Sequence, residues 1–357
     1  MPDNILHTLQ QEALDLLKQL ITIPSFSKEE HLTADLLVSF LTGRTPHVER
    51  LKNNVWVRNK YFDAAKPTIL LNSHHDTVKP NKGYTLDPFD PIEKEGKLFG
   101  LGSNDAGGPL VALLATFLYY NEQQGLPYNF LFVASAEEEI SGRDGVELLI
   151  PTLPPLAFGI VGEPTQMQMA VAERGLMVLD CIAHGRAGHA ARNEGENALY
   201  KAMVDIDWFR NYAFPKVSDL LGPVKMTVTV IETENKAHNV VPAQCKFVVD
   251  VRVNELYSFE EVLDCIRQHV SCEVQPRSTR LRSTSIALDH PLVQAGIQLN
   301  RTYYGSPTTS DKALMAFPTL KMGPGDSARS HTADEYIFID EIKQGIDLYI
   351  QLLNQVL

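Results

Sequence analysis

The hydrophobic pattern of the chain is organised around short apolar runs, each followed at once by polar or acidic residues. Four such runs occupy residues 68–72, 129–135, 157–161 and 319–322. Runs of this length are typical of strands that are buried on both faces of a parallel sheet. Helix-like segments lie between them, such as residues 109–121, which begin with a proline at the expected first helical position. The alternation predicts an α/β fold with a mostly parallel sheet.

The stretch from residue 173 to residue 279 has a different pattern. Its expected elements are strands at 176–183, 224–231, 246–252 and near Glu273, with helices at 197–212 and 259–270. This order, β-α-β-β-α-β, is the ferredoxin-like plan of a compact sandwich. The α/β pattern resumes afterwards, so we predict a domain at residues 173–279 inserted into a discontinuous domain made of residues 1–172 and 280–357.

The composition is that of an ordinary globular protein, with 44% hydrophobic and 21% charged residues in a chain of 357. This length suggests two domains, or one large domain that carries an insertion. The formal net charge of -12 argues against a nucleic-acid or anionic-membrane binder, because such proteins present a basic face. We therefore expect a small-molecule substrate, and neither nucleic acid nor membrane as a partner.

Targeting signals and cysteine usage favour a cytoplasmic protein. The N-terminus opens on a helix-period pattern without the basic start and apolar block of a signal peptide, and no apolar run reaches the length of a membrane span. The four cysteines form no Cys-x-x-Cys pair and lie in apolar or helical stretches. We interpret them as reduced packing residues.

Candidate catalytic residues follow the ends of the predicted strands, and the carboxyl-terminal rim of an open α/β sheet is where ligands bind. His74 and Asp76 follow the first run, two residues apart. A metal-binding histidine needs a partner that holds its ring, and a carboxylate at this spacing can supply it. Taken alone, the segment is more typical of a solvated His/Asp turn.

A glycine-rich loop at residues 100–108 contains Asp105 and precedes a helix. It lacks the Gly-Lys-Ser/Thr ending of a phosphate-binding P-loop, and it presents a carboxylate where a phosphate would need bare amides. An acidic residue in such a loop suits a metal ion, although many glycine-rich loops are simply turns.

Three adjacent acids, Glu137, Glu138 and Glu139, follow the second apolar run, and Glu163 follows the third. Acids placed directly after buried strands are costly unless a cation lies among them, although a solvated charge run is the common alternative. His331 supplies a second imidazole in a further glycine-rich loop. Two histidines and several carboxylates at neighbouring strand ends predict a mixed nitrogen and oxygen site for zinc or a similar divalent ion.

The order of these motifs resembles the zinc aminoacylase and carboxypeptidase family, which includes acetylornithine deacetylase, succinyl-diaminopimelate desuccinylase and glutamate carboxypeptidase. The resemblance covers essentially the whole chain. The matching motifs are Ile23-Pro24-Ser25, His74-His75-Asp76-Thr77-Val78, the Asp105 loop, Glu138-Glu139, Gly162-Glu163-Pro164-Thr165, Gly188-His189-Ala190, Asn239-Val240-Val241-Pro242, Asp250-Val251-Arg252 and His331-Thr332-Ala333-Asp334-Glu335.

The resemblance implies two zinc ions bridged by Asp105, for which cobalt or manganese can substitute. One ion would also be held by His74 and Glu163, and the other by Glu139 and His331. Asp76 would orient His74, and Glu138 would act as general base for hydroxide attack on an amide. The discontinuous domain would then be the zinc catalytic domain, and the insertion a lid and dimerisation domain.

The family also implies a homodimer in which a lid histidine, here His189, reaches the active site of the partner and supports the oxyanion. Asn239 and Arg252 match lid positions that contact substrate. The residues alone favour a surface histidine at position 189, and Arg252 can pair with Asp250 on the same strand.

Two features depart from the family pattern. The usual Asp-Glu-Glu triplet is Glu137-Glu138-Glu139 here, and the register that places the base at Glu138 follows from Ile140 and Gly142. Leu101 and Gly107 replace basic residues in the glycine-rich loop, which bears on substrate choice more than on metal binding.

The glycine-rich loop and the chain length look most like the acetylornithine deacetylase branch. We therefore expect a deacylase that removes an acetyl or succinyl group from an N-acyl amino acid, with N-acyl-L-ornithine in arginine biosynthesis as the favoured substrate. Lys312 and Arg329 are candidate anchors for an added carboxylate, or are solvated. The alternatives are a zinc dipeptidase or aminopeptidase of the same fold, and a non-catalytic metal-binding homologue.

Overall fold

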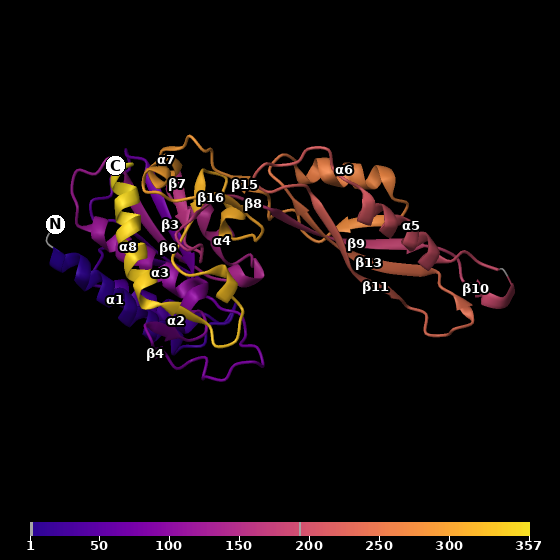
Figure 1. Ribbon diagram of the computed structural model, residues 1–357, viewed down its shortest axis with the longest axis horizontal. Coiled ribbons are helices and arrows are strands. Elements are labelled where there is room, and N and C mark those ends of the chain that lie inside the picture. The colour runs from indigo at the N-terminus through magenta and orange to yellow at the C-terminus, as the bar shows by residue number, and fades with distance from the viewer. Residues whose placement is uncertain (1–2, 193) are drawn as a thin grey trace. The chain divides into compact units, whose positions relative to one another are not determined.

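The computed structural model describes residues 3–192 and 194–357 of the chain (Figure 1). The chain forms two compact units. Unit 1 consists of Met1–Val171, Ser285–Tyr304 and Ser310–Leu357, and unit 2 consists of Ala172–Thr284 and Gly305–Thr309. The roles of catalytic domain and lid stay predictions for these units.

Unit 1 contains a central sheet, a smaller sheet and the longest helices of the chain. Its helices are α1 (Asp3–Ile21), α2 (His31–Leu41), α3 (Gly108–Asn121), α4 (Val146–Leu149), α7 (Pro291–Gln298) and α8 (Ile339–Asn354). Its strands are β1 (Val48–Leu51), β2 (Asn54–Arg58), β3 (Thr68–His74), β4 (Ile92–Lys94), β5 (Lys97–Phe99), β6 (Asn129–Ser135), β7 (Leu156–Val161), β17 (Thr319–Lys321) and β18 (Tyr336–Phe338). Single turns are η1 (Ser103–Gly107), η2 (Glu138–Ile140), η3 (Ile150–Thr152), η5 (Asp311–Leu314) and η6 (Ser327–Arg329). Three strands span a unit boundary along the chain: β8 (Met169–Glu173), β15 (Thr284–Ser285) and β16 (Tyr303–Ser306).

Among the described residues, the central sheet has nine strands in the order β1-β2-β6-β3-β7-β17-β8-β15, and β16 also pairs with β8. The pairs β6–β3, β3–β7 and β7–β17 are parallel, and antiparallel strands flank this centre. Strands β3 and β6 are buried along their whole length, because helix α3 covers one face and the other packs on a cluster that includes Val146 and Leu149 of α4. Helices α1, α3 and α8 lie side by side (Figure 1). The predicted α/β fold with its parallel centre is confirmed.

The register of the central strands brings their carboxyl ends to one edge of the sheet. His74 at the end of β3 pairs with Ser135 at the end of β6, and Asn72 pairs with Val161 at the end of β7. The residues that directly follow these strands therefore emerge together. This edge is where an open α/β sheet binds ligands.

The smaller sheet of unit 1 has the antiparallel order β18-β5-β4. Tyr336, the first residue of β18, pairs with Phe99, the last residue of β5. The chain just before β18 is thus held against the chain that leaves β5 and enters η1.

The longer elements of unit 2 follow the predicted order β-α-β-β-α-β, and two strands of two residues each are added to them. Its elements are β9 (Gly175–His184), β10 (Gly188–His189), η4 (Ala190–Arg192), α5 (Ala198–Asn211), β11 (Lys225–Thr233), β12 (Val240–Val241), β13 (Gln244–Val253), α6 (Phe259–His269) and β14 (Glu273–Pro276). The main strands form an antiparallel sheet in the order β11-β13-β9-β14. Alternate residues of β9 are buried against helices α5 and α6, which gives the unit its own core.

The cysteines and the longest helices bear on the predictions about disulfides and membrane spans. Cys181, Cys245, Cys265 and Cys272 are all free thiols. Among the described helices, none combines the length and the apolar character that a membrane span requires.

Candidate active site

His74 is the last residue of β3, and its imidazole is buried. Its Nδ1 lies 2.9 Å from the backbone oxygen of Asp76 and 3.5 Å from Oδ1 of the same residue. A proton on Nδ1 donates to this carbonyl, which leaves the lone pair of Nε2 available to a ligand. Asp76 therefore orients the imidazole as predicted. The acceptor nearest to Nδ1, however, is the backbone carbonyl of Asp76 and not its carboxylate.

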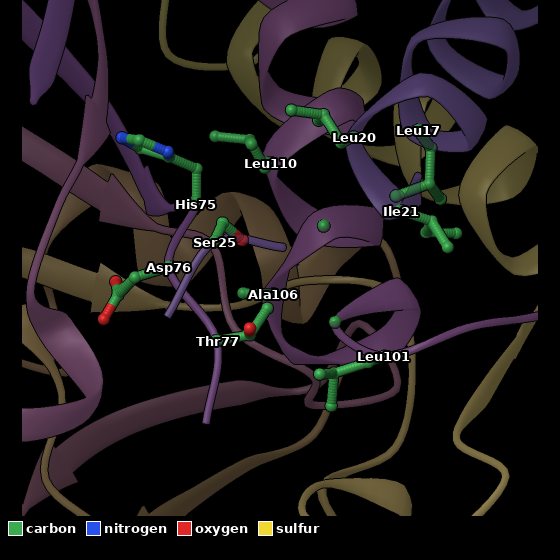
Figure 2. Close-up of a pocket in the computed structure, with 12 residues that line it drawn as sticks. Leu17, Leu20, Ile21, Ser25, His75, Asp76, Thr77, Leu101, Ala106 and Leu110 are labelled. Carbon is green, nitrogen blue, oxygen red and sulfur yellow. The ribbon is translucent and has the colours of Figure 1, made fainter. Parts of the chain in front are cut away.

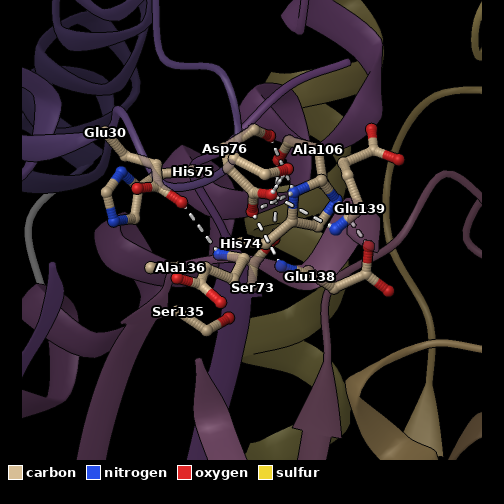
Figure 3. Close-up of polar contacts among 12 residues, drawn as sticks. Glu30, Ser73, His74, His75, Asp76, Ala106, Ser135, Ala136, Glu138 and Glu139 are labelled. Atoms are coloured by element: carbon tan, nitrogen blue, oxygen red, sulfur yellow. Dashed lines mark hydrogen bonds and ion pairs between the residues drawn. The ribbon is translucent and has the colours of Figure 1, made fainter. Parts of the chain in front are cut away.

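The Nε2 atom of His74 faces three carboxylates, of which that of Glu138 is labelled in Figure 3. It lies 3.4 Å from Oδ1 of Asp105, 3.9 Å from Oε2 of Glu138 and 4.0 Å from Oε1 of Glu163. Asp105 comes from η1, Glu138 from η2, and Glu163 from the loop after β7. Three loops that are distant in sequence thus meet at one imidazole nitrogen.

His331 forms a second cluster around the same aspartate. Its Nε2 lies 3.0 Å from Oε2 and 3.2 Å from Oε1 of Glu139, and 3.7 Å from Oδ2 of Asp105. One oxygen of Asp105 therefore faces His74 and the other faces His331. This is the arrangement that a bridging ligand requires.

The electrostatics of the cluster favour a cation. Burial alone lowers the pKa of His74, but hydrogen bonds to Asp105 and Asp76 outweigh it and raise this pKa well above its ordinary value. Burial raises the pKa of Glu138 well above the usual range for glutamate, and Glu163 adds to the effect. The neighbouring carboxylates thus raise the pKa of His74, whereas the pKa of Glu138 is raised by burial first and by neighbouring carboxylates second.

Asp76 also organises the turn that carries the adjacent acids. Its Oδ1 accepts the backbone N–H of Glu138 over 3.1 Å, and its Oδ2 accepts the N–H of Glu139 over 3.2 Å and the hydroxyl of Ser27 over 2.7 Å. These bonds fix the start of η2 against the end of β3. Glu138 and Glu139 then face different histidines.

Glu137 lies outside this cluster. Its N–H donates to buried Glu30 over 3.0 Å, and its carbonyl accepts the N–H of Gly142 over 2.8 Å. Glu137 adopts a left-handed conformation with φ of 55°, and a Cβ at Gly142 would collide with its side chain. This geometry supports the register that assigns the metal-facing positions to Glu138 and Glu139.

The predicted substrate residues lie in unit 2. His189 is exposed on β10, where its Nδ1 accepts the N–H of Ala191 over 3.2 Å, and the carbonyl of Asn239 accepts the N–H of Ala190 over 3.0 Å. Arg252 on β13 donates twice to Asp250, over 2.8 and 3.0 Å. The pairing of Arg252 that the sequence left open is therefore present in the structure.

Lys312 and Arg329, the candidate anchors, both make contacts inside unit 1. Buried Lys312 donates from Nζ to the carbonyl of Val171 over 3.1 Å. Arg329 forms a bidentate pair with Glu341 over 2.7 and 3.0 Å and stacks over Tyr336. Neither cation is simply solvated.

Sequence analysis assigned no function to three buried carboxylates that lie near the site, those of Glu335, Glu30 and Asp311. Glu335 accepts backbone N–H groups of the Asp105 loop, Glu30 accepts that of Glu137, and Asp311 accepts the hydroxyl of Ser135 over 2.6 Å. Glu335 stands inside a recognised motif, which was a usable signal. No sequence signal marks Glu30 or Asp311, because their hydrogen-bond partners are distant in the sequence.

A small cavity lies behind Asp76, between the loop after β3 and helices α1 and α3 (Figure 2). Its volume is about 20 Å³, which is room for one water molecule. Among the described residues, Thr77 Oγ1 at this cavity has no hydrogen-bond partner. The cavity is too small for an amino-acid substrate.

The donor set fits divalent cations. Ligand atoms of His74, Glu138 and Glu163, and those of His74, Asp105 and Glu139, lie within 4.8 Å of one another. Imidazole nitrogens and carboxylate oxygens are the donors that zinc takes in hydrolytic sites. Nothing in this part of the chain conflicts with a metal centre.

The chain is similar in sequence and in fold to known hydrolases. The chain is 25% identical over 277 residues to succinyl-diaminopimelate desuccinylase 2 of Ruegeria sp., covering 72% of this chain and 69% of that protein. It is 29% identical over 351 residues to a putative LysW-lysine/LysW-ornithine hydrolase of Pyrobaculum aerophilum, covering 92% and 93%. The fold matches the YXEP protein of Bacillus subtilis, described as a dinuclear metal binding peptidase, with a TM-score of 0.75, 14% identity and coverage of 98% and 99%.

The family assignment rests on most of the chain. Residues 70–355 match the sequence model of Peptidase family M20/M25/M40. This range contains all the clustered candidate residues and the whole of unit 2. The predicted family and the predicted class of enzyme are confirmed, and the chain belongs to Peptidase family M20/M25/M40 as a metal-dependent amide hydrolase.

Proposed function

We propose that the protein removes an acetyl or succinyl group from an N-acyl amino acid, with N-acyl-L-ornithine as the favoured substrate. The carboxylate of Glu138 carries this proposal, because it lies beside the cluster in which Asp105 faces both histidines. A binding protein has no need of a base at that position. The relatives named for desuccinylase and LysW-ornithine hydrolase activity support an acyl-amine bond as the target.

We assign two zinc ions to the site, with cobalt or manganese as substitutes. His74, Asp105 and Glu163 would hold one ion, and Asp105, Glu139 and His331 the other. The two faces of Asp105 support this division. Divalent cations so held supply Lewis acidity toward a carbonyl oxygen and lower the pKa of water.

Residues of the chain carry out the proton transfers. Glu138 takes a proton from the attacking water and returns it to the leaving nitrogen. The amide C–N bond breaks, a C–O bond forms, and the products are a carboxylic acid and a free amine. Asp76 keeps Glu138 in place through the N–H bond described above.

The proposal includes a homodimer formed through unit 2, in which His189 supports the oxyanion in the active site of the partner. Unit 2 exposes an apolar surface on α5 that comprises Tyr200 (66% exposed), Met203 (56%) and Val204 (71%). Strand β11, which contacts α5, is an edge strand of the described sheet. An exposed apolar helix beside an unpaired strand edge suits a second copy of the chain.

Mixed dimers test this part of the proposal. Subunits with His189→Ala and subunits with Glu138→Gln are each inactive alone, but a mixed dimer contains one intact site if His189 acts across the interface. Mixing should restore up to about a quarter of the wild-type activity per chain, since half of the dimers are mixed and each has one of two sites. If the activity of the mixture does not exceed the summed activities of the two variants measured separately, the active site is not shared between subunits.

Asn239 and Arg252 are assigned to substrate contact, the arginine to a carboxylate through its forked donors. Asp250 already accepts from Nε and Nη2 of this arginine, so a substrate carboxylate would bind on the Nη1 side or replace Asp250. Arg252→Lys should therefore raise KM more than it lowers kcat. An unchanged KM would remove Arg252 from the substrate site.

A substrate panel tests the function as a whole. N-acetyl-, N-succinyl- and N-formyl-ornithine, citrulline and diaminopimelate should be compared with plain dipeptides, with and without added zinc. The proposal predicts faster hydrolysis of blocked amines, with ornithine derivatives ahead. A strict need for a free α-amino group would favour the dipeptidase or aminopeptidase alternative, and a panel without turnover would favour the non-catalytic one.

A further inference from the structure

Glu335 joins two segments that carry proposed metal ligands. It directly precedes β18, and only 2% of its surface is exposed. Its backbone oxygen accepts the N–H of Gly100 over 3.0 Å, in continuation of the pairing between β18 and β5. The sheet thus brings the Glu335 side chain to the loop that contains Asp105.

The carboxylate of Glu335 accepts three backbone N–H groups of that loop. Its Oε2 accepts from Gly102 over 3.0 Å, and its Oε1 accepts from Asn104 and from Asp105 itself, each over 2.9 Å. Without this acceptor, three N–H groups would be left unpaired in a buried place, which is costly. The loop therefore depends on Glu335 for its conformation.

The same segment carries His331, four residues before Glu335. A second set of bonds supports this connection, because Asn104 Nδ2 donates to the carbonyl of Asp326 over 3.0 Å and Asn104 Oδ1 accepts the N–H of Asp326 over 2.9 Å. Glu335 and Asn104 together fix Asp105 relative to His331. These contacts maintain the distance of 3.7 Å between Asp105 Oδ2 and His331 Nε2.

Asp105 belongs to both proposed cation positions, but the other two ligands of the second position, His74 and Glu163, are anchored independently of Glu335. His74 ends a buried strand and is held by Asp76, and the carbonyl of Gly162, just before Glu163, accepts the hydroxyl of Ser73 over 2.8 Å. These contacts belong to the central sheet. They do not involve Glu335.

We propose that Glu335 is a positioning residue for the metal centre: it holds Asp105 against His331, and its loss weakens cation binding at the Asp105–Glu139–His331 position more than at the His74–Asp105–Glu163 position. This inference rests on the proposed pair of cations. Groups that orient metal ligands typically contribute about 10–100-fold to metal affinity.

Asp334 offers a matched control. This neighbouring carboxylate accepts the N–H groups of Thr85 and Leu86 over 2.8 and 2.9 Å, and the hydroxyl of Thr85 over 2.6 Å. It too accepts three bonds, but from an exposed loop without any proposed ligand. Asp334→Asn therefore reports the general effect of removing an amide-binding carboxylate from this segment.

The experiment is zinc titration by calorimetry of the full chain after chelation and dialysis, with bound zinc counted by elemental analysis. The variants are Glu335→Gln, Glu335→Ala and Asp334→Asn, each checked for folding by circular dichroism. Wild type and Asp334→Asn should bind two equivalents. Glu335→Ala should retain one tight equivalent and bind the second about 10–100-fold more weakly, with Glu335→Gln between, since an amide oxygen still accepts some of the N–H groups.

The outcomes separate this inference from the proposed function. A wild-type chain that binds no zinc would contradict the proposed function itself. A wild-type chain that binds two equivalents, together with Glu335 variants of unchanged affinity at both positions, would overturn only the role of Glu335. Equal weakening of both positions would also overturn it. If Glu335→Ala does not fold, the isosteric Glu335→Gln decides the result.

Discussion

The backbone N–H of Glu138 donates to Oδ1 of Asp76 over 3.1 Å. This bond connects the turn after β6 to the turn after β3, and the same aspartate presents its backbone carbonyl to His74. Asp76 thus orients both the proposed base and a proposed metal ligand. Its carboxylate acts through other groups, because its oxygens are occupied by backbone N–H groups and by Ser27.

Asp76→Asn should lower kcat/KM by about 10–100-fold, because its amide group opposes one of the two N–H donors and loosens the turn. Ser27→Ala is the matched control, since it removes a single hydroxyl and leaves the bonds to Glu138 and Glu139. Steady-state kinetics with zinc-saturated enzyme measure both. Equal losses in the two variants would mean that the bonds to the turn are unimportant.

Glu138→Gln should lower kcat by at least about 10²–10⁴-fold, because a neutral amide cannot take the proton, while zinc content stays unchanged. Glu137→Gln should retain most activity, since Glu137 lies outside the cluster. Kinetics and elemental analysis of the two variants test the register of the acidic triplet. The opposite pattern would move the base to Glu137.

Zinc binding to the metal-free chain should release protons. The hydrogen bond to Glu139 raises the pKa of His331 to about 9, so this imidazole is protonated at pH 7 in the absence of metal. A cation binds only the neutral ring, and zinc affinity should therefore fall as the pH drops below about 9. Calorimetry at pH 7 in buffers of different ionisation enthalpy counts the protons.

His331→Ala serves as the reference for that count. It should release about one proton fewer than wild type and should bind less zinc. Identical proton release in the two proteins would show that His331 does not lose a proton to the metal.

Val204→Asp should convert the protein to a monomer and remove the activity that depends on His189, because it places a charge in the exposed apolar surface of α5. Leu32→Asp, on an exposed position of α2 in unit 1, should leave the dimer intact. Light scattering after gel filtration gives the mass. A wild-type chain that is already monomeric would contradict the proposed dimer.

Local sequence patterns predict much of the fold and of the cluster. The apolar runs anticipate β3, β6, β7 and β17, and His74 and Glu163 were identifiable because they directly follow such runs. Period-two alternation at residues 246–252 anticipates β13, in which every second residue is buried. These features are encoded by neighbouring residues, so one segment suffices to recognise them.

Long-range bonds to backbone groups were not predictable in this way. Glu30 reaches the N–H of Glu137 across 107 positions, and Glu335 reaches that of Asp105 across 230. A backbone N–H is the same for nearly every residue type, so no pairing of side chains indicates the partner. The role of Asp76 was predicted only in part for the same reason, since its carbonyl holds His74.

We propose that amide hydrolysis depends on two cations held by five side chains, those of His74, Asp105, Glu139, Glu163 and His331. The most direct measurement combines elemental analysis of the purified chain with hydrolysis of N-acetyl-L-ornithine before chelation, after chelation and after return of zinc. We predict about two equivalents of transition metal per chain, loss of activity on chelation, and recovery with zinc. A chain that contains no stoichiometric metal and hydrolyses the substrate equally well after chelation would contradict the account.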